Sequence, residues 1–158
     1  EGVRQRRVLF VWLGNICRSP MAEGLLRKYA QEQGVKVEVD SAATSRYQIG
    51  EAPHPGTQKI LRQHQVDVQN MIARQITSED FLTFDYIIGM DRQNVIDLMK
   101  IAPEGTKKKV HLFLSVEADD SIQDVPDPWY TGDFQETNQL IQAALSKWLT
   151  YWSKNESR

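Results

Sequence analysis

Residues 8–26 read VLFVWLGNICRSPMAEGLL, and this stretch decides the fold. The apolar run at 8–12 is rich in β-forming residues, which is typical of a strand buried on both faces of a parallel sheet. Ser19 predicts a helix N-cap and Pro20 suits the first helical position, after which apolar residues recur at helical spacing until Gly34. The stretch therefore predicts a strand, a short loop and a helix, in that order.

The same alternation continues along the chain. Further strands are predicted at 35–39, 86–90 and 110–114. Helices are predicted at 55–65, 91–101 and 134–152, a short helical turn at Ser78, and loops at 41–50 and 115–132. Strands that alternate with helices indicate a doubly wound α/β fold with a parallel sheet. Such sheets bind ligands beyond the carboxyl ends of their strands.

The composition excludes several classes of protein. The chain has 158 residues, of which 41% are hydrophobic and 25% charged, and we expect one domain over 1–158. A formal charge of −2 argues against a nucleic-acid binder with a broad basic face. The single cysteine, Cys17, cannot form a disulfide within the chain, and the three histidines lack the spacing of zinc ligands. No metal or other cofactor is therefore expected. The apolar run at 8–13 is too short to span a membrane or form a signal-peptide core, so we expect a cytoplasmic protein without membrane contact.

The loop after the first strand is a candidate anion site. Backbone N–H groups and the positive end of the following helix can converge there on one anion, and the Arg18 guanidinium can bind two phosphate oxygens. Gly14 and Asn15 tolerate the positive φ angles that such a loop requires. The dinucleotide pattern GxGxxG and the Walker pattern GK[ST] are absent. The alternative is an ordinary strand-to-helix turn with an exposed Arg18.

Five ordered segments make the sequence recognisable. They are VLFVWLGNICRSPMAE at 8–23, VDSAATSRYQIG at 39–50, ARQIT at 73–77, FDYIIGMDRQN at 84–94 and DPWYTGDF at 127–134. With these segments the chain resembles the low-molecular-weight protein tyrosine phosphatases over nearly its whole length. The resemblance implies a flavodoxin-like fold, in which helices flank a four-stranded parallel sheet and a phosphate loop of the form C-x5-R-S follows the first strand. It also implies hydrolysis of phosphotyrosine in proteins, or of small aryl phosphates, through a phosphocysteine intermediate and without a cofactor.

The resemblance assigns roles to single residues. Arg18 would bind the phosphoryl oxygens, and Asp127 would protonate the leaving phenol and then activate water. Ser41 would support the loop from outside. The phosphate-binding loop itself would comprise Leu13, Gly14, Asn15, Ile16, Cys17, Arg18 and Ser19, in which Asn15 shapes the loop and Ser19 stabilises the thiolate. The aromatic walls around the substrate ring would be Tyr47, Trp129 and Tyr130.

The nucleophile does not carry over from the family. Trp12 stands six positions before Arg18, where the family has cysteine, and an indole cannot form a phosphoryl intermediate. Cys17 cannot replace it, because the residue six positions later is Glu23 rather than arginine. We expect Trp12 either to fill the phosphate volume or to swing outward and distort the loop. A buried tryptophan without a ligand role is the alternative. A second departure is Met71, where many family members have a histidine that supports the loop, so a hydrogen-bond partner of the loop is expected to be missing.

Three functional hypotheses result. The first is a tyrosine phosphatase whose nucleophile has been replaced, so that the chain is catalytically dead or severely impaired. The second is a natural pseudophosphatase that binds a partner or a phosphotyrosine-containing protein without turnover. The third, an arsenate-reductase relative with the same fold, needs additional relay cysteines, and we set it aside because Cys17 is the only cysteine. The sequence leaves the oligomeric state open.

Overall fold

Four parallel strands form one sheet in the computed structural model, which describes residues 6–119 and 121–154. The strands are β1 (Arg6–Trp12), β2 (Val37–Ala43), β3 (Tyr86–Gly89) and β4 (Val110–Leu112), in the spatial order β2-β1-β3-β4. The helices are α1 (Arg18–Gln33), α2 (Pro55–Gln63), α3 (Ser78–Thr83), α4 (Arg92–Ile101), α5 (Pro128–Thr131) and α6 (Phe134–Lys154), with 3-10 turns at Lys107–Lys109 and Phe113–Val116. The predicted parallel α/β fold is confirmed. Residues 1–5, 120 and 155–158 of the predicted domain lie outside the described residues.

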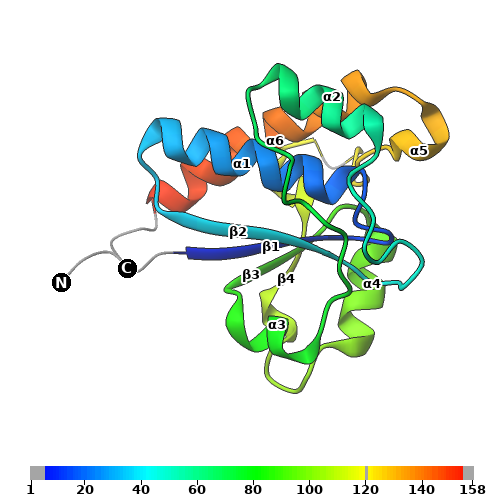
Figure 1. Ribbon diagram of the computed structural model, residues 1–158. Coiled ribbons are helices and arrows are strands. Elements are labelled where there is room, and N and C mark those ends of the chain that lie inside the picture. Colours follow the sequence, from blue (N-terminus) through cyan, green and yellow to red (C-terminus); the bar gives the residue numbers. More distant parts are fainter. Residues whose placement is uncertain (1–5, 120, 155–158) are drawn as a thin grey trace.

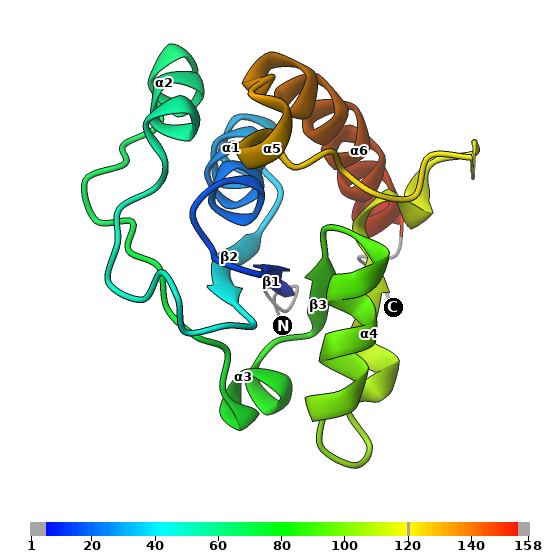
Figure 2. The ribbon, with the colours of Figure 1, turned by 90° about the vertical axis from the view of Figure 1, so that its right-hand side faces the viewer.

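Helices cover both faces of the sheet. Figures 1 and 2 show α1, α2 and α6 on one face and α3 and α4 on the other. Because side chains of a strand alternate between faces, Val8 and Phe10 of β1 pack into the first layer, and Leu9 and Val11 pack into the second. All four side chains are fully buried, so the prediction of a strand buried on both faces is confirmed.

The second strand differs from its prediction. β2 begins at Val37 and continues to Ala43, so the prediction of a strand at 35–39 and a loop from residue 41 is wrong. Residues 41–43 pair with Phe10, Val11 and Trp12 of β1. Serine and alanine carry little alternation in hydrophobicity, and here the parallel ladder with the central strand decides the conformation.

Two further boundaries depend on local hydrogen bonds. Arg18 begins α1 and Cys17 occupies the N-cap position without a side-chain cap, so the prediction of Ser19 as N-cap is wrong. The Ser19 hydroxyl instead accepts a hydrogen bond from Asn15 in the preceding loop. The predicted loop 115–132 contains the single turn α5, because the Asp127 carboxylate accepts a hydrogen bond from the backbone N–H of Trp129.

The packing of α2 against α6 can be tested by its effect on stability. A Cβ atom on Gly56 would lie 2.6 Å from three ring atoms of Phe134, which stacks on His54 at a centroid distance of 4.9 Å. We expect Gly56→Ala to lower the free energy of unfolding by about 1–3 kcal/mol, because the ring must move out of a packed layer. Lys59→Ala, on the exposed side of the same helix, should change it by less than about 0.5 kcal/mol. Urea denaturation measures both, and equal values for the two variants would contradict the packing argument.

Candidate functional site

The site lies where the strand order reverses, at the carboxyl ends of β1 and β3. The chain leaves β1 toward α1 on one face of the sheet and leaves β3 toward α4 on the other. Such a divergence opens a crevice that accepts ligands in parallel sheets. Figure 2 views this end of the sheet, with α5 beside the loop that joins β1 to α1.

Trp12 points into that loop. Its residue is only 6% exposed, and the Arg18 Cζ atom lies 5.2 Å from the centroid of the indole ring. A Cβ atom on Gly14 would lie 3.2 Å from Trp12 Cζ3. The indole therefore packs against both the backbone of Gly14 and the guanidinium of Arg18. The side chain is buried against the loop rather than turned outward.

Gly14 and Asn15 occupy their positions in the loop for different structural reasons. Asn15 has φ of 59°, as predicted for a left-handed position. Gly14 is not among the described residues with positive φ, so that part of the prediction is wrong. A Cβ atom on Gly14 would approach Gln48 Cγ to 3.0 Å as well as the indole. Close packing, rather than backbone conformation, thus accounts for glycine there.

Arg18 is buried, with 3% of its surface exposed, so the alternative of an exposed arginine in an ordinary turn is wrong. Its Nη1 donates to the Val125 carbonyl oxygen at 2.6 Å and lies 3.0 Å from Asp91 Oδ2. Its Nη2 lies 3.7 Å from Asp127 Oδ2. The buried Nε has no hydrogen-bond partner among the described residues. The guanidinium is thus held by two carboxylates and one carbonyl.

Asp91 is a site residue that the sequence reasoning missed. It follows β3 and caps α4, where its Oδ1 accepts a hydrogen bond from the Asn94 backbone N–H at 2.8 Å. Its other oxygen contacts Arg18. An aspartate placed directly after a buried strand and before a helix is a usable sequence signal, since such positions face the crevice in this fold class.

Asp127, to which the resemblance gives the role of acid, lies beside Arg18. Its Oδ1 accepts the hydrogen bond from the Trp129 N–H at 3.0 Å, and its side chain is 16% exposed. Burial raises the pKa of Asp127, and Asp91 acts in the same direction. Arg18 and the Trp129 N–H lower the pKa but do not cancel the effect of burial. The carboxyl group therefore stays protonated to a higher pH than an exposed aspartate.

Cys17 is the one thiol of the chain and is fully buried. Burial raises its pKa to about 12, and the charge of Asp127 adds to this effect, while Arg18 opposes it. The reactive form of cysteine is the thiolate. The chain therefore holds no activated thiol at neutral pH.

Thiol labelling tests this conclusion. At pH 8, native Cys17 should react with a disulfide reagent such as DTNB about 10³-fold more slowly than an unperturbed thiol, because so little thiolate is present at a pKa of about 12. In denaturant the same residue should react at the ordinary rate. Fast labelling of the native chain, at a rate that does not follow global unfolding, would contradict the assignment.

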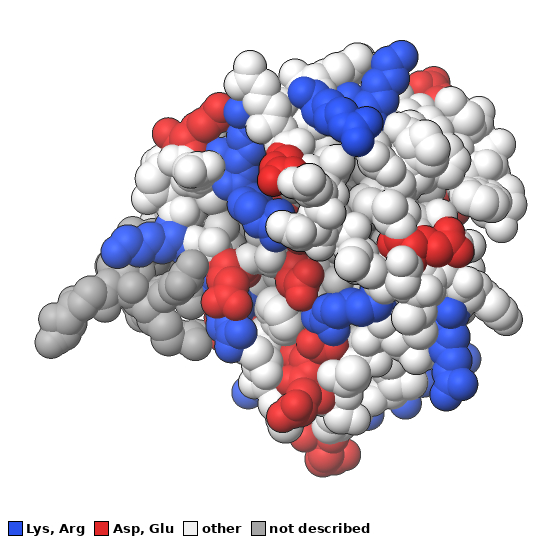
Figure 3. Space-filling view, viewed as in Figure 1, with Lys and Arg blue, Asp and Glu red and all other residues white. Residues whose placement is uncertain are grey.

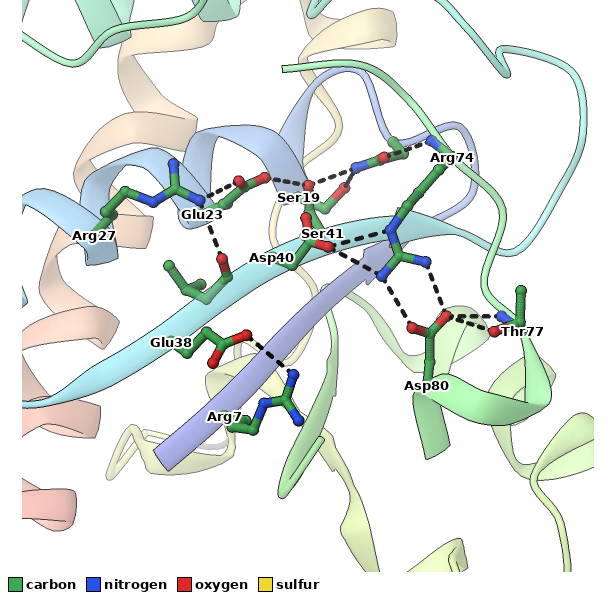
Figure 4. Close-up of polar contacts among 12 residues, drawn as sticks. Arg7, Ser19, Glu23, Arg27, Glu38, Asp40, Ser41, Arg74, Thr77 and Asp80 are labelled. Carbon is green, nitrogen blue, oxygen red and sulfur yellow. Dashed lines mark hydrogen bonds and ion pairs between the residues drawn. The ribbon is translucent and has the colours of Figure 1, made fainter. Parts of the chain in front are cut away.

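A polar network supports the loop from behind (Figure 4). Asn15 Nδ2 donates to Ser19 Oγ and to Ser41 Oγ, both at 2.9 Å, and its Oδ1 accepts from the Arg74 backbone N–H at 3.1 Å. Ser41 Oγ in turn donates to Glu23 Oε1 at 2.6 Å. The amide that holds the left-handed turn is thus fixed on both its nitrogen and its oxygen. Ser41, to which the resemblance gives a supporting role, belongs to this network, whereas the sequence reasoning did not find Glu23 or Arg74.

Charged groups anchor this network at its two ends. Burial raises the pKa of Glu23, although its bond from Ser41 and its ion pair with Arg27, 2.5 Å away, lower it. The Arg74 guanidinium makes two hydrogen bonds to Asp80, at 2.9 and 3.0 Å. Met71 lines a cavity beside Asn15 and Ser41. In this chain Glu23 and the Arg74 backbone therefore each supply a hydrogen bond to the network of Asn15 and Ser41.

A cavity of about 200 Å³ opens in front of the indole. The three predicted aromatic residues all line it, beside Trp12 and Asp127. The full lining is Trp12, Leu13, Gly14, Ser45, Tyr47, Gln48, Asp127, Trp129 and Tyr130. Trp129 is also contacted edge-on by His54, with ring centroids 5.7 Å apart. The remaining loop residues are buried and do not line this cavity, namely Asn15, Ile16, Cys17, Arg18 and Ser19.

Charges of both signs are interspersed on the face shown in Figure 3. Several of the surface charges are paired, such as Arg7 with Glu38 and Arg92 with Asp124. Among the described residues, no group of three or more His, Cys, Asp and Glu side chains is placed to hold a metal ion. No helix in the same part of the chain has both the length and the apolar character needed to cross a membrane.

Comparisons with known proteins define the class. The sequence profile of the family described as "Low molecular weight phosphotyrosine protein phosphatase" matches residues 7–158. The low molecular weight protein-tyrosine-phosphatase YfkJ of Bacillus subtilis is 42% identical over 151 residues, which cover 94% of this chain and 97% of that protein. PtpA of Staphylococcus epidermidis, which carries the same description, is 40% identical over 94% of each chain.

Solved structures agree with the sequence relatives. The crystal structure of YfkJ from Bacillus subtilis matches with a TM-score of 0.91 and 41% identity, covering 97% of this chain and 98% of that one. A product-state mimic of the protein tyrosine phosphatase from Entamoeba histolytica matches with a TM-score of 0.88 and 31% identity, covering 95% and 97%. The chain belongs to the low-molecular-weight phosphotyrosine protein phosphatase family, and its flavodoxin-like fold is the one that the resemblance implied.

Proposed function

We propose that this chain, as one cytoplasmic phosphatase-like domain over 1–158, carries the machinery for phosphotyrosine hydrolysis with Trp12 at the nucleophile position. Turnover is therefore abolished or severely impaired. The observation that carries the proposal is the indole of Trp12 inside the loop, 5.2 Å from the Arg18 guanidinium. The substrates of the corresponding active enzyme are phosphotyrosine-containing proteins and small aryl phosphates.

The surrounding residues fit the chemistry that a cysteine at position 12 would perform. Its thiolate would attack phosphorus, and the phenolate would leave with the proton of the Asp127 carboxyl group. The raised pKa of Asp127 suits a general acid, because it keeps the proton available at higher pH. Arg18 would hold the phosphoryl oxygens, and Asp127, once ionised, would take a proton from the water that attacks the phosphocysteine.

Ser19 and Asn15 fit supporting roles in the same reaction. Asn15 Nδ2 donates to Ser19 Oγ, so the acceptor side of that hydroxyl is occupied and its proton remains available as a donor. A hydroxyl proton near position 12 would stabilise a thiolate there. These two residues retain an arrangement that serves an anion at the end of β1.

Trp12 prevents this reaction in two independent ways. Its indole has no nucleophilic lone pair, so no phosphoryl intermediate can form on it. Its indole, packed against Gly14 and Arg18, would also compete with a phosphoryl group for the space beside the guanidinium. Cys17 cannot compensate, because it is buried and has a pKa of about 12.

A binding module is the second candidate function, in which the chain holds a ligand or partner without turnover. The specific observation in its favour is the cavity of about 200 Å³ that remains in front of Trp12, lined by Tyr47, Trp129 and Tyr130. Three aromatic residues around a cavity favour binding of a ligand, even where no reaction follows.

Replacement of Trp12 tests the catalytic proposal. Trp12→Cys should hydrolyse p-nitrophenyl phosphate, whereas the unmodified chain should be slower by a factor on the order of 10⁶. Trp12→Ala is the matched control, because it removes the indole without supplying a nucleophile. It should therefore bind inorganic phosphate more tightly than the unmodified chain, measured by calorimetry, yet show no turnover. Aryl-phosphate turnover by the unmodified chain that disappears with Arg18→Ala would refute the proposal.

The acid assignment is tested in the Trp12→Cys background. Turnover should have an acidic optimum and decline as pH rises through the Asp127 pKa, since only the protonated carboxyl donates to the leaving group. Asp127→Asn should remove this decline. It should also slow substrates with poor leaving groups most, because these need the proton most. Equal slowing for all leaving groups would argue against general-acid catalysis.

A further inference from the structure

The cavity in front of Trp12 offers aromatic side chains and one carboxyl group but no cationic side chain. Four of its nine lining residues are aromatic, namely Trp12, Tyr47, Trp129 and Tyr130, and one is the acid Asp127. None of the nine is lysine or arginine. Electron-rich aromatic faces and a carboxylate attract cations and disfavour anions.

The neighbouring charges reinforce this preference. The Arg18 Cζ atom lies 5.2 Å from the centroid of the indole ring, but Arg18 is also paired with Asp91 at 3.0 Å and with Asp127 at 3.7 Å. Each of these carboxyl groups, when ionised, offsets the positive charge of the guanidinium. Arg18 is also not among the residues that line the cavity.

Two parts of the cavity wall are held by contacts within the protein. The Trp129 backbone N–H donates to Asp127, and the Trp129 indole is contacted edge-on by His54. Elsewhere in the lining, Ser45 donates from both its hydroxyl and its backbone N–H to the Leu13 carbonyl oxygen, at 2.7 and 3.1 Å. Such preorganisation lowers the entropic cost of binding.

We propose that this cavity is an aromatic cage for an organic ammonium group that carries several methyl groups, such as a trimethylammonium head group. The cavity volume of about 200 Å³ lies below the roughly 300–1,000 Å³ of sites for drug-sized ligands, so a small head group fits it best. The aromatic faces receive the methylated cation and Asp127 supplies the opposite charge. The inference rests on the proposed function, because Trp12 both ends phosphate chemistry and completes the cage.

The chemistry is shared by two sources, a free small molecule such as choline and a trimethylated lysine side chain in a protein. Both present the same head group, and they differ in the chain attached to it. Exposed Tyr47 and Tyr130, each more than 80% exposed, stand at the rim and can contact residues that flank a methylated lysine. A peptide with a trimethyllysine should therefore bind more tightly than choline if the natural ligand is a protein, and equally if it is a small molecule.

Titrations at constant ionic strength test the cage. Amide shifts in NMR spectra, or calorimetry, should show choline binding about tenfold more tightly than 3,3-dimethyl-1-butanol, its uncharged isostere. Inorganic phosphate should bind more weakly than choline. Asp127→Asn, which preserves the shape of the side chain, should reduce the preference for choline several-fold. Tyr151→Ala changes an exposed aromatic residue that packs on Trp148 of α6, outside the cavity lining, and should leave choline binding unchanged.

Equal binding of choline and its isostere, tighter binding of phosphate, or no effect of Asp127→Asn would each overturn the cage. The Trp12→Cys variant separates this inference from the proposed function. If that variant hydrolyses aryl phosphates while the unmodified chain binds no choline, the proposed function stands and the cage is wrong. Aryl-phosphate turnover by the unmodified chain refutes the proposed function, regardless of whether choline binds.

Discussion

The buried guanidinium of Arg18 is the constraint on which the functional end of this molecule depends. A charge with 3% exposure needs compensation from within the protein, because its hydration has been removed. Asp91, Asp127 and the Val125 carbonyl provide it, and they come from the start of α4 and the segment before α5. The loop after β1 is thereby tied to two distant parts of the chain. Removing either carboxylate would release one of these ties.

The same charge acts on two other titratable groups of the site. It lowers the pKa of both Cys17 and Asp127, yet burial prevails in each case. For a thiol, a raised pKa means an unreactive side chain. For Asp127, a raised pKa means that the carboxyl group keeps its proton to a higher pH. When this group is ionised, its negative charge lies in surroundings of low dielectric constant. The site therefore favours Asp127 as a general acid, or as a partner for a cation, over a reaction of the Cys17 thiol.

The sequence predicted the elements with strong patterns. β1 was predictable because the apolar run at 8–12 is rich in β-forming residues, as in a strand covered on both faces, and α6 because its apolar positions repeat over several turns. The end of β2 and the single turn α5 were not predictable. Ser41 and Ala42 become strand through pairing with β1, and α5 forms because Asp127 caps it. The role of Asp91 in the site was not predicted from the sequence, because its partner Arg18 is distant along the chain.

By itself, the sequence determined the family, the α/β order of elements and the presence of an indole six residues before Arg18, since these depend on residue identity and spacing alone. Only the tertiary structure decided where that indole points, because the choice depends on how Gly14 and Arg18 flank it. The same holds for the partners of Arg18, the burial of Cys17 and the aromatic lining of the cavity. Each results from contacts between residues separated along the chain, which local patterns do not encode.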